Sequence, residues 1–183
     1  IIKFKNNVKY EIKPFLPPKM SIKINNEVVE MMLYFWQSAS EGQKVVESFI
    51  IDVANRDEMK LIYNDKFDEE AVRRVLSSIT NKELLNGGSP EEKRFWNNNM
   101  WMMEDMGVVE AMVDPIKHLN LDDVETDKKE LIFVPGHVDE YYDLGDKLVV
   151  NFFKVSVDIF GGTGAVTMDG EDFREHIIKL LQK

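Results

Sequence analysis

Apolar side chains recur at helical spacing through most of residues 26–117. The longest such stretch runs from Ser89 to Pro115. Its start is marked by Ser89 with Glu92 three residues later, the pattern of a capping box in which each residue satisfies a free backbone N–H. Its end is marked by Pro115, because a proline disfavours helical geometry in the residue before it. The pattern predicts a single long helix.

Projected at about 100° per residue, the apolar positions of this stretch cover three adjoining faces of the helix. Only a narrow strip through Asn97, Glu104 and Ala111 is left for solvent. A helix with so little polar surface is predicted to be buried on nearly every side. We therefore expect a central buried helix, at about 90–113, that the other helices surround.

Four further amphipathic helices are predicted from apolar periodicity and start signals. Asp68 is a well-supported N-cap, because Phe67 and Val72 can pack across it as a hydrophobic staple. Ser40 with Gln43 forms a second capping-box pattern, which predicts a helix start at Glu41. The predicted helices run from Asn26 to Trp36, from Glu41 to about Ala54, from Asp68 to Ile79, and from a cap at Asp169 to Leu181.

Strand patterns lie at both ends of the chain. Residues 1–13 alternate apolar and polar side chains around Asn6-Asn7, which predicts a β-hairpin. A short extended piece is predicted at Ser21–Ile24. Three more strands are predicted near the C-terminus, at Leu131–Val134, Lys147–Val157 and Ala165–Met168. The middle one is long enough that we expect it to bend or bulge.

Strands at both ends with helices between them predict an α+β fold with a mixed or antiparallel sheet, rather than alternating βαβ units. The sheet would combine the N-terminal hairpin with the C-terminal strands. The length of 183 residues predicts one domain, 1–183. Within it we expect a helical subdomain at about 26–117 and a β-rich C-terminal part at about 130–183, joined by an acidic linker.

Composition narrows the classes of partner. The net charge is −10, which repels nucleic-acid phosphates and anionic membrane surfaces, so neither is a predicted partner. The chain has no cysteine, which removes disulfides, thiolate metal sites and cysteine nucleophiles. No stretch approaches the roughly 20 apolar residues of a membrane span. A cytoplasmic location is predicted, although a chain that begins at Ile1 leaves N-terminal processing open.

The densest group of titratable and aromatic side chains lies between two predicted strands, at Pro135–Asp143. A histidine beside carboxylates can act as a general base or as a metal ligand. If the protein is an enzyme, the predicted catalytic residues are His137, Asp139, Glu140 and Tyr141. The alternative is a loop with solvated acids and half-buried tyrosines, which is favoured because no nucleophile or second histidine is nearby. Neither a cofactor nor a metal ion is predicted.

Other candidates have simpler explanations. The glycine-rich run Phe160–Ala165 precedes a predicted strand rather than a helix, which favours a hairpin loop over a phosphate site. Glu110, Asp114 and His118 recur at four-residue intervals, but Pro115 interrupts the helix that would align them, and they are expected to face solvent. His176 is expected at the surface. The methionines of residues 100–112 are expected to fill the core, unless a flanking helix leaves one face uncovered and available for binding.

Two function classes remain. The first is a non-catalytic protein–protein interaction module whose partner is another protein, possibly a basic one, recognised by charge complementarity. The second is a small hydrolase-type enzyme with its site in the 135–143 connection. The absence of an assembled catalytic constellation in the sequence favours the interaction module.

Overall fold

The computed structural model describes residues 20–183, as seven α-helices and two small sheets. The helices are α1 (Glu27–Ser40), α2 (Glu47–Ala54), α3 (Asp57–Lys60), α4 (Glu69–Thr80), α5 (Pro90–Met102), α6 (Met106–Lys117) and α7 (Phe173–Leu181). The strands are β1 (Lys23–Asn25), β2 (Glu130–Val134), β3 (Tyr141–Asp143), β4 (Lys147–Asn151), β5 (Val155–Val157), β6 (Val166–Met168) and β7 (Glu171–Asp172). The predicted α+β class is therefore confirmed.

The larger sheet has the strand order β1-β2-β4-β3, in which only β3 is antiparallel to its neighbour. β2 and β4 are buried along almost their whole length, as expected for parallel strands covered on both faces. The extended piece predicted at 21–24 forms β1 at Lys23–Asn25, which pairs with β2. The single predicted sheet is wrong, because β5, β6 and β7 form a second sheet. The hairpin predicted at residues 1–13 lies outside the described residues.

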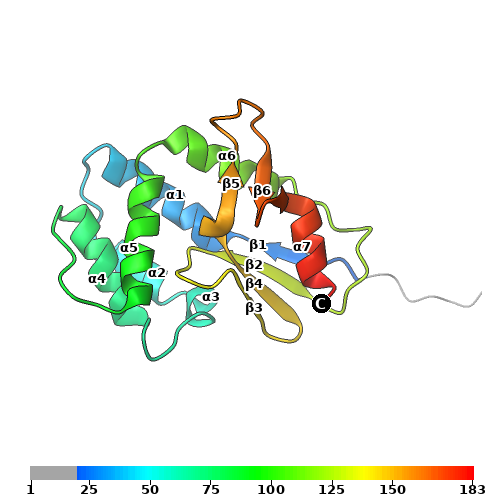
Figure 1. The fold of residues 1–183 in the computed structure, drawn as a ribbon. Coiled ribbons are helices and arrows are strands. Elements are labelled where there is room, and N and C mark those ends of the chain that lie inside the picture. The colour runs from blue at the N-terminus through cyan, green and yellow to red at the C-terminus, as the bar shows by residue number, and fades with distance from the viewer. Residues whose placement is uncertain (1–19) are drawn as a thin grey trace, which may run out of the picture.

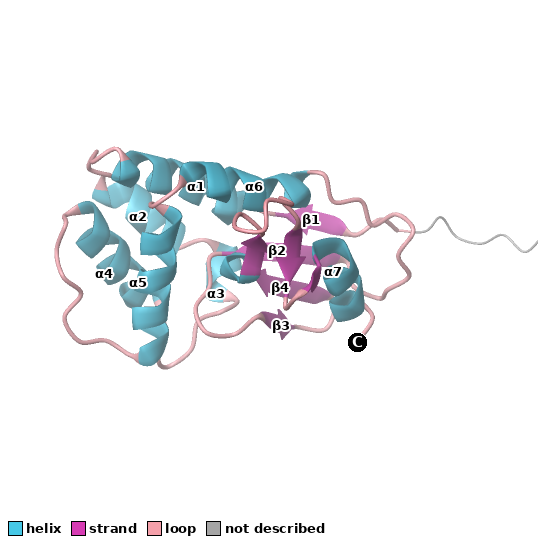
Figure 2. Ribbon diagram, turned by 45° about the horizontal axis from the view of Figure 1, so that its top comes forward, coloured by secondary structure: helices cyan, strands magenta, loops and turns pink. Residues whose placement is uncertain are grey.

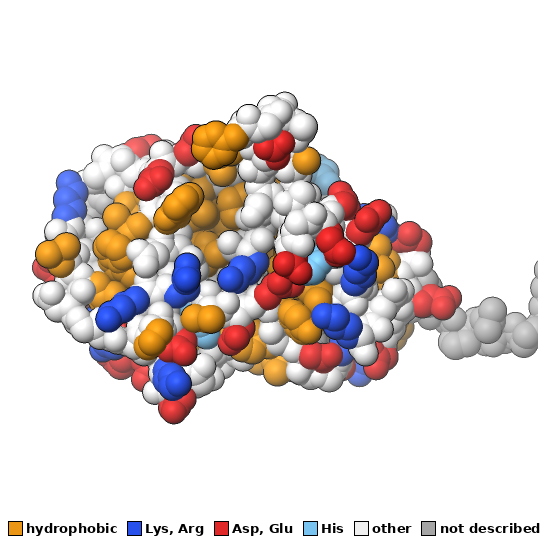
Figure 3. All heavy atoms as spheres, in the orientation of Figure 1, with side chains coloured by type: hydrophobic (Ala, Val, Ile, Leu, Met, Phe, Trp, Pro, Cys, Tyr) orange, Lys and Arg blue, Asp and Glu red, His pale blue; other side chains and the backbone are white. Residues whose placement is uncertain are grey.

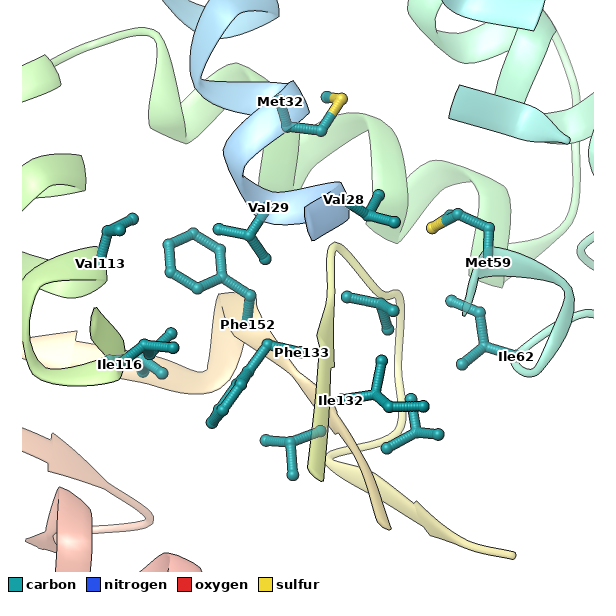
Figure 4. Close-up of a cluster of buried hydrophobic side chains, with 14 of the residues drawn as sticks. Val28, Val29, Met32, Met59, Ile62, Val113, Ile116, Ile132, Phe133 and Phe152 are labelled. Carbon is teal, nitrogen blue, oxygen red and sulfur yellow. The ribbon is translucent and has the colours of Figure 1, made fainter. Parts of the chain in front are cut away.

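Helices α2, α4 and α5 gather at one end of the molecule. In Figure 1 they lie on the left, whereas α7 lies on the right, and β5 and β6 of the smaller sheet lie above the four-stranded sheet. Figure 4 shows Val29 of α1 and Phe152 facing Phe133 of β2, with Ile116 of α6 beside them. All four side chains are buried, and burying a large apolar side chain contributes about 1.5–3 kcal/mol. This core ties α1 and α6 to the sheet.

The long helix predicted at about 90–113 is two helices, and the prediction of one central helix is corrected here. α5 ends at Met102 and α6 begins at Met106. Asp105 Oδ1 accepts hydrogen bonds from the backbone N–H groups of Gly107 and Val108 at 2.9 and 3.3 Å. A side-chain cap of this kind starts a new helix. Figure 2 shows that α5 and α6 run in clearly different directions.

The burial of α5 is one-sided. Phe95 and Asn99 are fully buried, and Asn99 accepts from Trp36 Nε1 at 2.9 Å while donating to the Phe95 carbonyl at 2.8 Å. Trp101, on another face, is 71% exposed. Because α6 turns away after Met102, it does not extend along α5. This helix is amphipathic rather than buried all round.

The predicted helix starts fare differently. Asp68 caps α4 by accepting from the Ala71 N–H at 2.9 Å, as predicted. Ser89 likewise accepts from the Glu92 N–H at 3.1 Å. The reciprocal half of that capping box is not formed, because the Glu92 carboxylate binds Arg74 at 2.6 and 3.1 Å. The buried carboxylate has a charged partner instead of a backbone amide.

Two other predicted caps are wrong. Ser40 belongs to the last turn of α1, where its hydroxyl donates to the Gln37 carbonyl at 2.8 Å. α7 is capped by Asp172, whose carboxylate accepts from the Glu175 N–H at 3.2 Å. Asp169 lies with Gly170 in the tight turn between β6 and β7, at φ angles of 51° and 74°. Asp-Gly is a favoured pair for such a turn.

The long strand predicted at Lys147–Val157 bends, as expected, and is divided. β4 ends at Asn151, a short 3₁₀ turn covers Phe152–Lys154, and β5 belongs to the second sheet. Asn151 Oδ1 accepts from the Phe153 N–H at 3.1 Å, which bends the backbone out of the ladder. The glycine-rich run then connects β5 to antiparallel β6, confirming the predicted hairpin.

Candidate functional site

The connection between β2 and β3 is held in place by one buried side chain, Asn151. Its Oδ1 accepts from the Gly136 N–H at 3.1 Å, and its Nδ2 donates to the carbonyls of His137 and Asp139 at 3.1 and 3.0 Å. The Asn151 N–H also donates to the Glu140 carbonyl at 2.8 Å. This backbone is therefore fixed to the end of β4, although it contains no regular structure before β3.

His137 points into the interior. It is only 1% exposed, and its ring lies 4.6 Å from the Phe67 ring, measured between centroids. Its Nε2 is 3.2 Å from the Tyr142 hydroxyl and 3.4 Å from the Ile62 carbonyl oxygen. The Tyr142 hydroxyl also donates to Asp139 Oδ2 at 3.1 Å. These contacts form a short hydrogen-bonded series, His137–Tyr142–Asp139.

Burial shifts the pKa values of His137 and Tyr142. Desolvation lowers the pKa of His137, and the Ile62 carbonyl, Asp139 and Glu91 oppose that shift only in part. Desolvation and the charge of Asp139 raise the pKa of Tyr142. His137 is therefore a neutral imidazole at neutral pH. Within residues 20–183, two buried atoms of this region, His137 Nδ1 and Glu91 Oε2, have no hydrogen-bond partner.

The other two predicted catalytic residues turn elsewhere. Tyr141 precedes Tyr142 in β3, and successive side chains of a strand point to opposite faces. The Tyr141 hydroxyl accepts from Lys183 Nζ at 3.1 Å, and the same ammonium lies 4.8 Å from the ring centroid. Glu140 reaches α7, where its carboxylate binds His176. The structure thus joins His137 with Asp139 and separates both from Glu140 and Tyr141.

His176 is buried, not at the surface as predicted, and both of its ring nitrogens face carboxylates. Nε2 lies 2.6 Å from Glu140 Oε1, and Nδ1 lies 3.0 Å from Glu171 Oε2. Burial lowers the pKa of His176, but hydrogen bonds and attraction from the two carboxylates outweigh it, so the net shift is upward. Glu171 is also paired with Lys179, which together with His176 lowers its pKa.

Asp169 completes a group of metal-ligand type around this histidine. One ligand atom each from Glu140, Asp169 and His176 lie within 4.8 Å of one another. Sequence reasoning did not find this group, because its members come from three separate segments and show no motif spacing. The only local signal was the position of His176 beside the apolar stripe of the last helix.

A groove opens between α1, α4 and α5, with a volume of about 320 Å³. Trp96, Met100 and Met103 line it and are half-buried, and Leu84 on its edge is 81% exposed. The expectation that the methionines of residues 100–112 fill the core holds for Met102 and Met112, which are buried, whereas Met100 and Met103 are only partly buried because they line this groove. Figure 3 shows hydrophobic side chains gathered on the side of the molecule where Figure 1 places α4 and α5. The remaining lining residues are Ala39, Gly42, Gln43, Ser78, Ile79, Thr80, Lys82 and Glu83.

Comparisons of the chain with protein-family models, with curated proteins and with solved structures found no match. Among residues 20–183, no helix combines the length and the apolar character needed to cross a membrane.

Proposed function

We propose that the protein is a non-catalytic interaction module that binds an amphipathic helix of a partner protein in the α1–α4–α5 groove. The observation that carries the proposal is the open apolar wall formed by Trp96, Met100 and Met103. Exposed apolar surface of this kind is typical of recognition sites. A groove between helices is the usual receptor for an amphipathic helix, whose anchors recur at three- and four-residue spacing.

The chemistry of the groove suits such a ligand. Methionine side chains are flexible and polarizable, so Met100 and Met103 can adapt to aliphatic or aromatic anchors. Trp96 adds a large rigid surface, the kind of residue that dominates binding energy at interfaces. Its buried indole N–H has no acceptor among the described residues. A partner that shifts this ring by a small rotation could supply a carbonyl oxygen for it.

Charge complementarity favours a basic partner helix. The chain has a net charge of −10. Electrostatic attraction therefore raises the association rate of a cationic partner, and repulsion disfavours acidic competitors. The same negative charge repels the phosphates of nucleic acids. A cytoplasmic location, expected from the sequence, is part of this proposal.

The proposal can be tested with a synthetic peptide of about 14–16 residues, four turns of helix. It carries leucine at one helical face and lysine elsewhere, and its binding is followed by calorimetry and by tryptophan fluorescence. We expect saturable 1:1 binding. The double variant Leu84→Gln, Met100→Gln removes two apolar contacts without adding charge, and we expect its affinity to fall at least ~10-fold.

The matched control is Leu144→Gln, which changes an exposed leucine of the β3–β4 turn and should leave the affinity unchanged. A second peptide has the same composition in an order that has no apolar face. Equal binding of both peptides would reduce the interaction to charge alone and overturn the groove as the site. The same conclusion follows if Leu144→Gln weakens binding as much as the groove variant.

A hydrolase-type activity centred on His137 is the second candidate. The observation that favours it is a pair of buried atoms, His137 Nδ1 and Glu91 Oε2, that have no hydrogen-bond partner within residues 20–183. Burial keeps His137 neutral, so its imidazole can accept a proton. Asp139 and Tyr142 would orient the ring. The low exposure of His137 means that a substrate could reach it only if the connection moved.

This second candidate is tested by measuring the wild-type protein and a double variant, His137→Ala, Asp139→Ala, across a broad panel of ester, amide and phosphate substrates. Activity in the wild type that is lost in the double variant and retained in Tyr141→Phe would support it. An identical profile for the wild type and the double variant would remove its basis.

A further inference from the structure

The structure assigns a divalent transition-metal site, of zinc type, to Glu140, Asp169 and His176. Ligand atoms of the three side chains lie within 4.8 Å of one another. Two carboxylates and one imidazole form a donor set that zinc accepts with an open coordination position. The imidazole sets the class of ion, because magnesium and calcium prefer all-oxygen ligands.

The three ligands are delivered by segments whose backbones are already fixed. Glu140 is anchored through its carbonyl to the Asn151 N–H at 2.8 Å. Asp169 lies in the two-residue turn between β6 and β7. His176 lies in α7, whose apolar face, with Phe173 and Ile177, is buried against the rest of the protein. A site built on such elements is preorganised.

A further residue, Glu171, sets the orientation of the histidine. His176 Nδ1 lies 3.0 Å from Glu171 Oε2, and Glu171 is in turn paired with Lys179. A carboxylate on one imidazole nitrogen leaves the other nitrogen free for a metal, and this arrangement is the rule among metal-binding histidines. The remaining nitrogen, Nε2, is the one that faces Glu140. Glu171 is thus a positioning residue rather than a ligand.

The geometry requires only small adjustments on binding. A tetrahedral zinc ion with ligands at 2.0–2.2 Å separates them by roughly 3–3.5 Å. The Glu140–His176 contact of 2.6 Å must open slightly, and Asp169 must close in. Asp169 is exposed on its turn, so its side chain can move without disturbing the core. A water molecule would complete the coordination.

Zinc would crosslink three separate parts of the chain, since Glu140 and His176 are 36 residues apart in sequence. Such an ion binds the folded state and not the unfolded chain, and it therefore stabilises the fold by mass action. We expect the Tm of the chelator-treated full chain to rise by roughly 5–10 °C when free zinc is about 100-fold above Kd. Magnesium at the same concentration should have no comparable effect.

The test combines zinc calorimetry with thermal unfolding on the wild type and on near-isosteric variants. We expect one zinc ion per chain. Asp169→Asn keeps a residue that tolerates the positive φ of the turn. Each of the three single variants, Asp169→Asn, Glu140→Gln and His176→Gln, should abolish tight zinc binding. Glu171→Gln should weaken zinc binding by about 10–100-fold, the usual effect of removing a residue that orients a ligand.

His118→Gln is the matched control. His118 is an exposed histidine 3.3 Å from a single carboxylate, Asp114, and its loss should leave zinc affinity unchanged. Unfolding in the presence of a chelator verifies that each variant folds, and Asp169→Asn alone decides the outcome if His176→Gln does not fold. The assignment is overturned if the wild type binds no zinc, if Asp169→Asn binds as tightly as the wild type, or if magnesium competes equally.

Discussion

His137 and His176 are both buried, and the same short connection between β2 and β3 contributes to the surroundings of each. Their pKa values nevertheless shift in opposite directions. His137 meets a tyrosine and a backbone carbonyl, and burial lowers its pKa. His176 meets two carboxylates, Glu140 and Glu171, which together raise its pKa despite burial. Burial alone does not set the charge of a histidine; the partners within hydrogen-bond reach decide it.

The difference also separates two possible roles. His137 packs against Phe67 and contacts the Tyr142 hydroxyl. A neutral histidine in these surroundings can stabilise the interior or accept a proton. A buried histidine of α7 that lies between two carboxylates is suited to holding a cation. The connection can serve both because its side chains point in different directions, with Asp139 toward the first histidine and Glu140 toward the second.

The largest expected effect on this arrangement is that of Asn151→Ala. The variant removes the four hydrogen bonds that this fully buried side chain makes with backbone groups of residues 136, 137, 139 and 153. We expect a loss of about 3 kcal/mol in the free energy of unfolding, measured by urea denaturation. Both histidine surroundings should loosen together.

Asn98→Ala is the control for that variant, because Asn98 reaches the same connection only through long contacts of 3.4 and 3.5 Å. Its cost should stay below about 1 kcal/mol. Equal costs for the two variants would show that the connection does not depend on the Asn151 side chain.

A smaller effect, and one that depends on pH, is expected for His137→Asn. At about pH 7.5 the variant should lose about 2 kcal/mol, since the ring leaves a cavity beside Phe67 and the contact with Tyr142 is lost. The folded-state pKa of His137 lies below its unfolded value, so its stabilising contribution is complete above the unfolded pKa, about 6.5, and falls as the pH drops below it. The groups facing this ring are Asp139, Glu91, Tyr142 and the Ile62 carbonyl.

The cost of His137→Asn should therefore be smaller at about pH 5.5 than at about pH 7.5. Urea denaturation at the two pH values measures this difference directly, and variation from other groups cancels between wild type and variant. A cost that grew on acidification would mean that His137 is charged in the folded protein, and the contrast with His176 would disappear.

The smallest effects come from a matched pair of adjacent tyrosines. Tyr142→Phe removes the hydroxyl between His137 and Asp139 and should cost about 1 kcal/mol. Tyr141→Phe removes only an exposed contact with Lys183, and its cost should be below about 0.5 kcal/mol. Thermal unfolding measures both costs. A larger cost for Tyr141→Phe than for Tyr142→Phe would show that the Lys183 contact stabilises β3 more than the His137–Tyr142–Asp139 series does.

The elements that sequence patterns predicted correctly depend on neighbours in the chain. The cap at Asp68, the β1 strand and the bend near Asn151 each follow from residues within a few positions. The incorrect ones show competition between local signals. Asp105 caps a second helix and thereby divides the predicted long one, and Asp169 occupies a turn whereas Asp172 caps α7.

The candidate sites could be predicted only in part. The 135–143 connection was identified from its density of titratable groups, yet the four predicted residues do not converge. Glu140 was included for its chemistry, but its partners, His176 and Asp169, lie more than 25 positions away and follow no motif. The sequence predicted a binding groove only on the condition that a flanking helix leaves one face of the methionine stretch uncovered.

The amino-acid sequence by itself determined the α+β class, most helix and strand locations, the acidic charge and the absence of cysteine chemistry. These follow from periodicity, capping and composition, which act over a few residues or need no geometry at all. Tertiary structure alone decided that half-buried Trp96 and Met100 line an open groove, and that His176 meets Glu140. Such contacts depend on how every intervening turn orients the chain, so no local pattern encodes them.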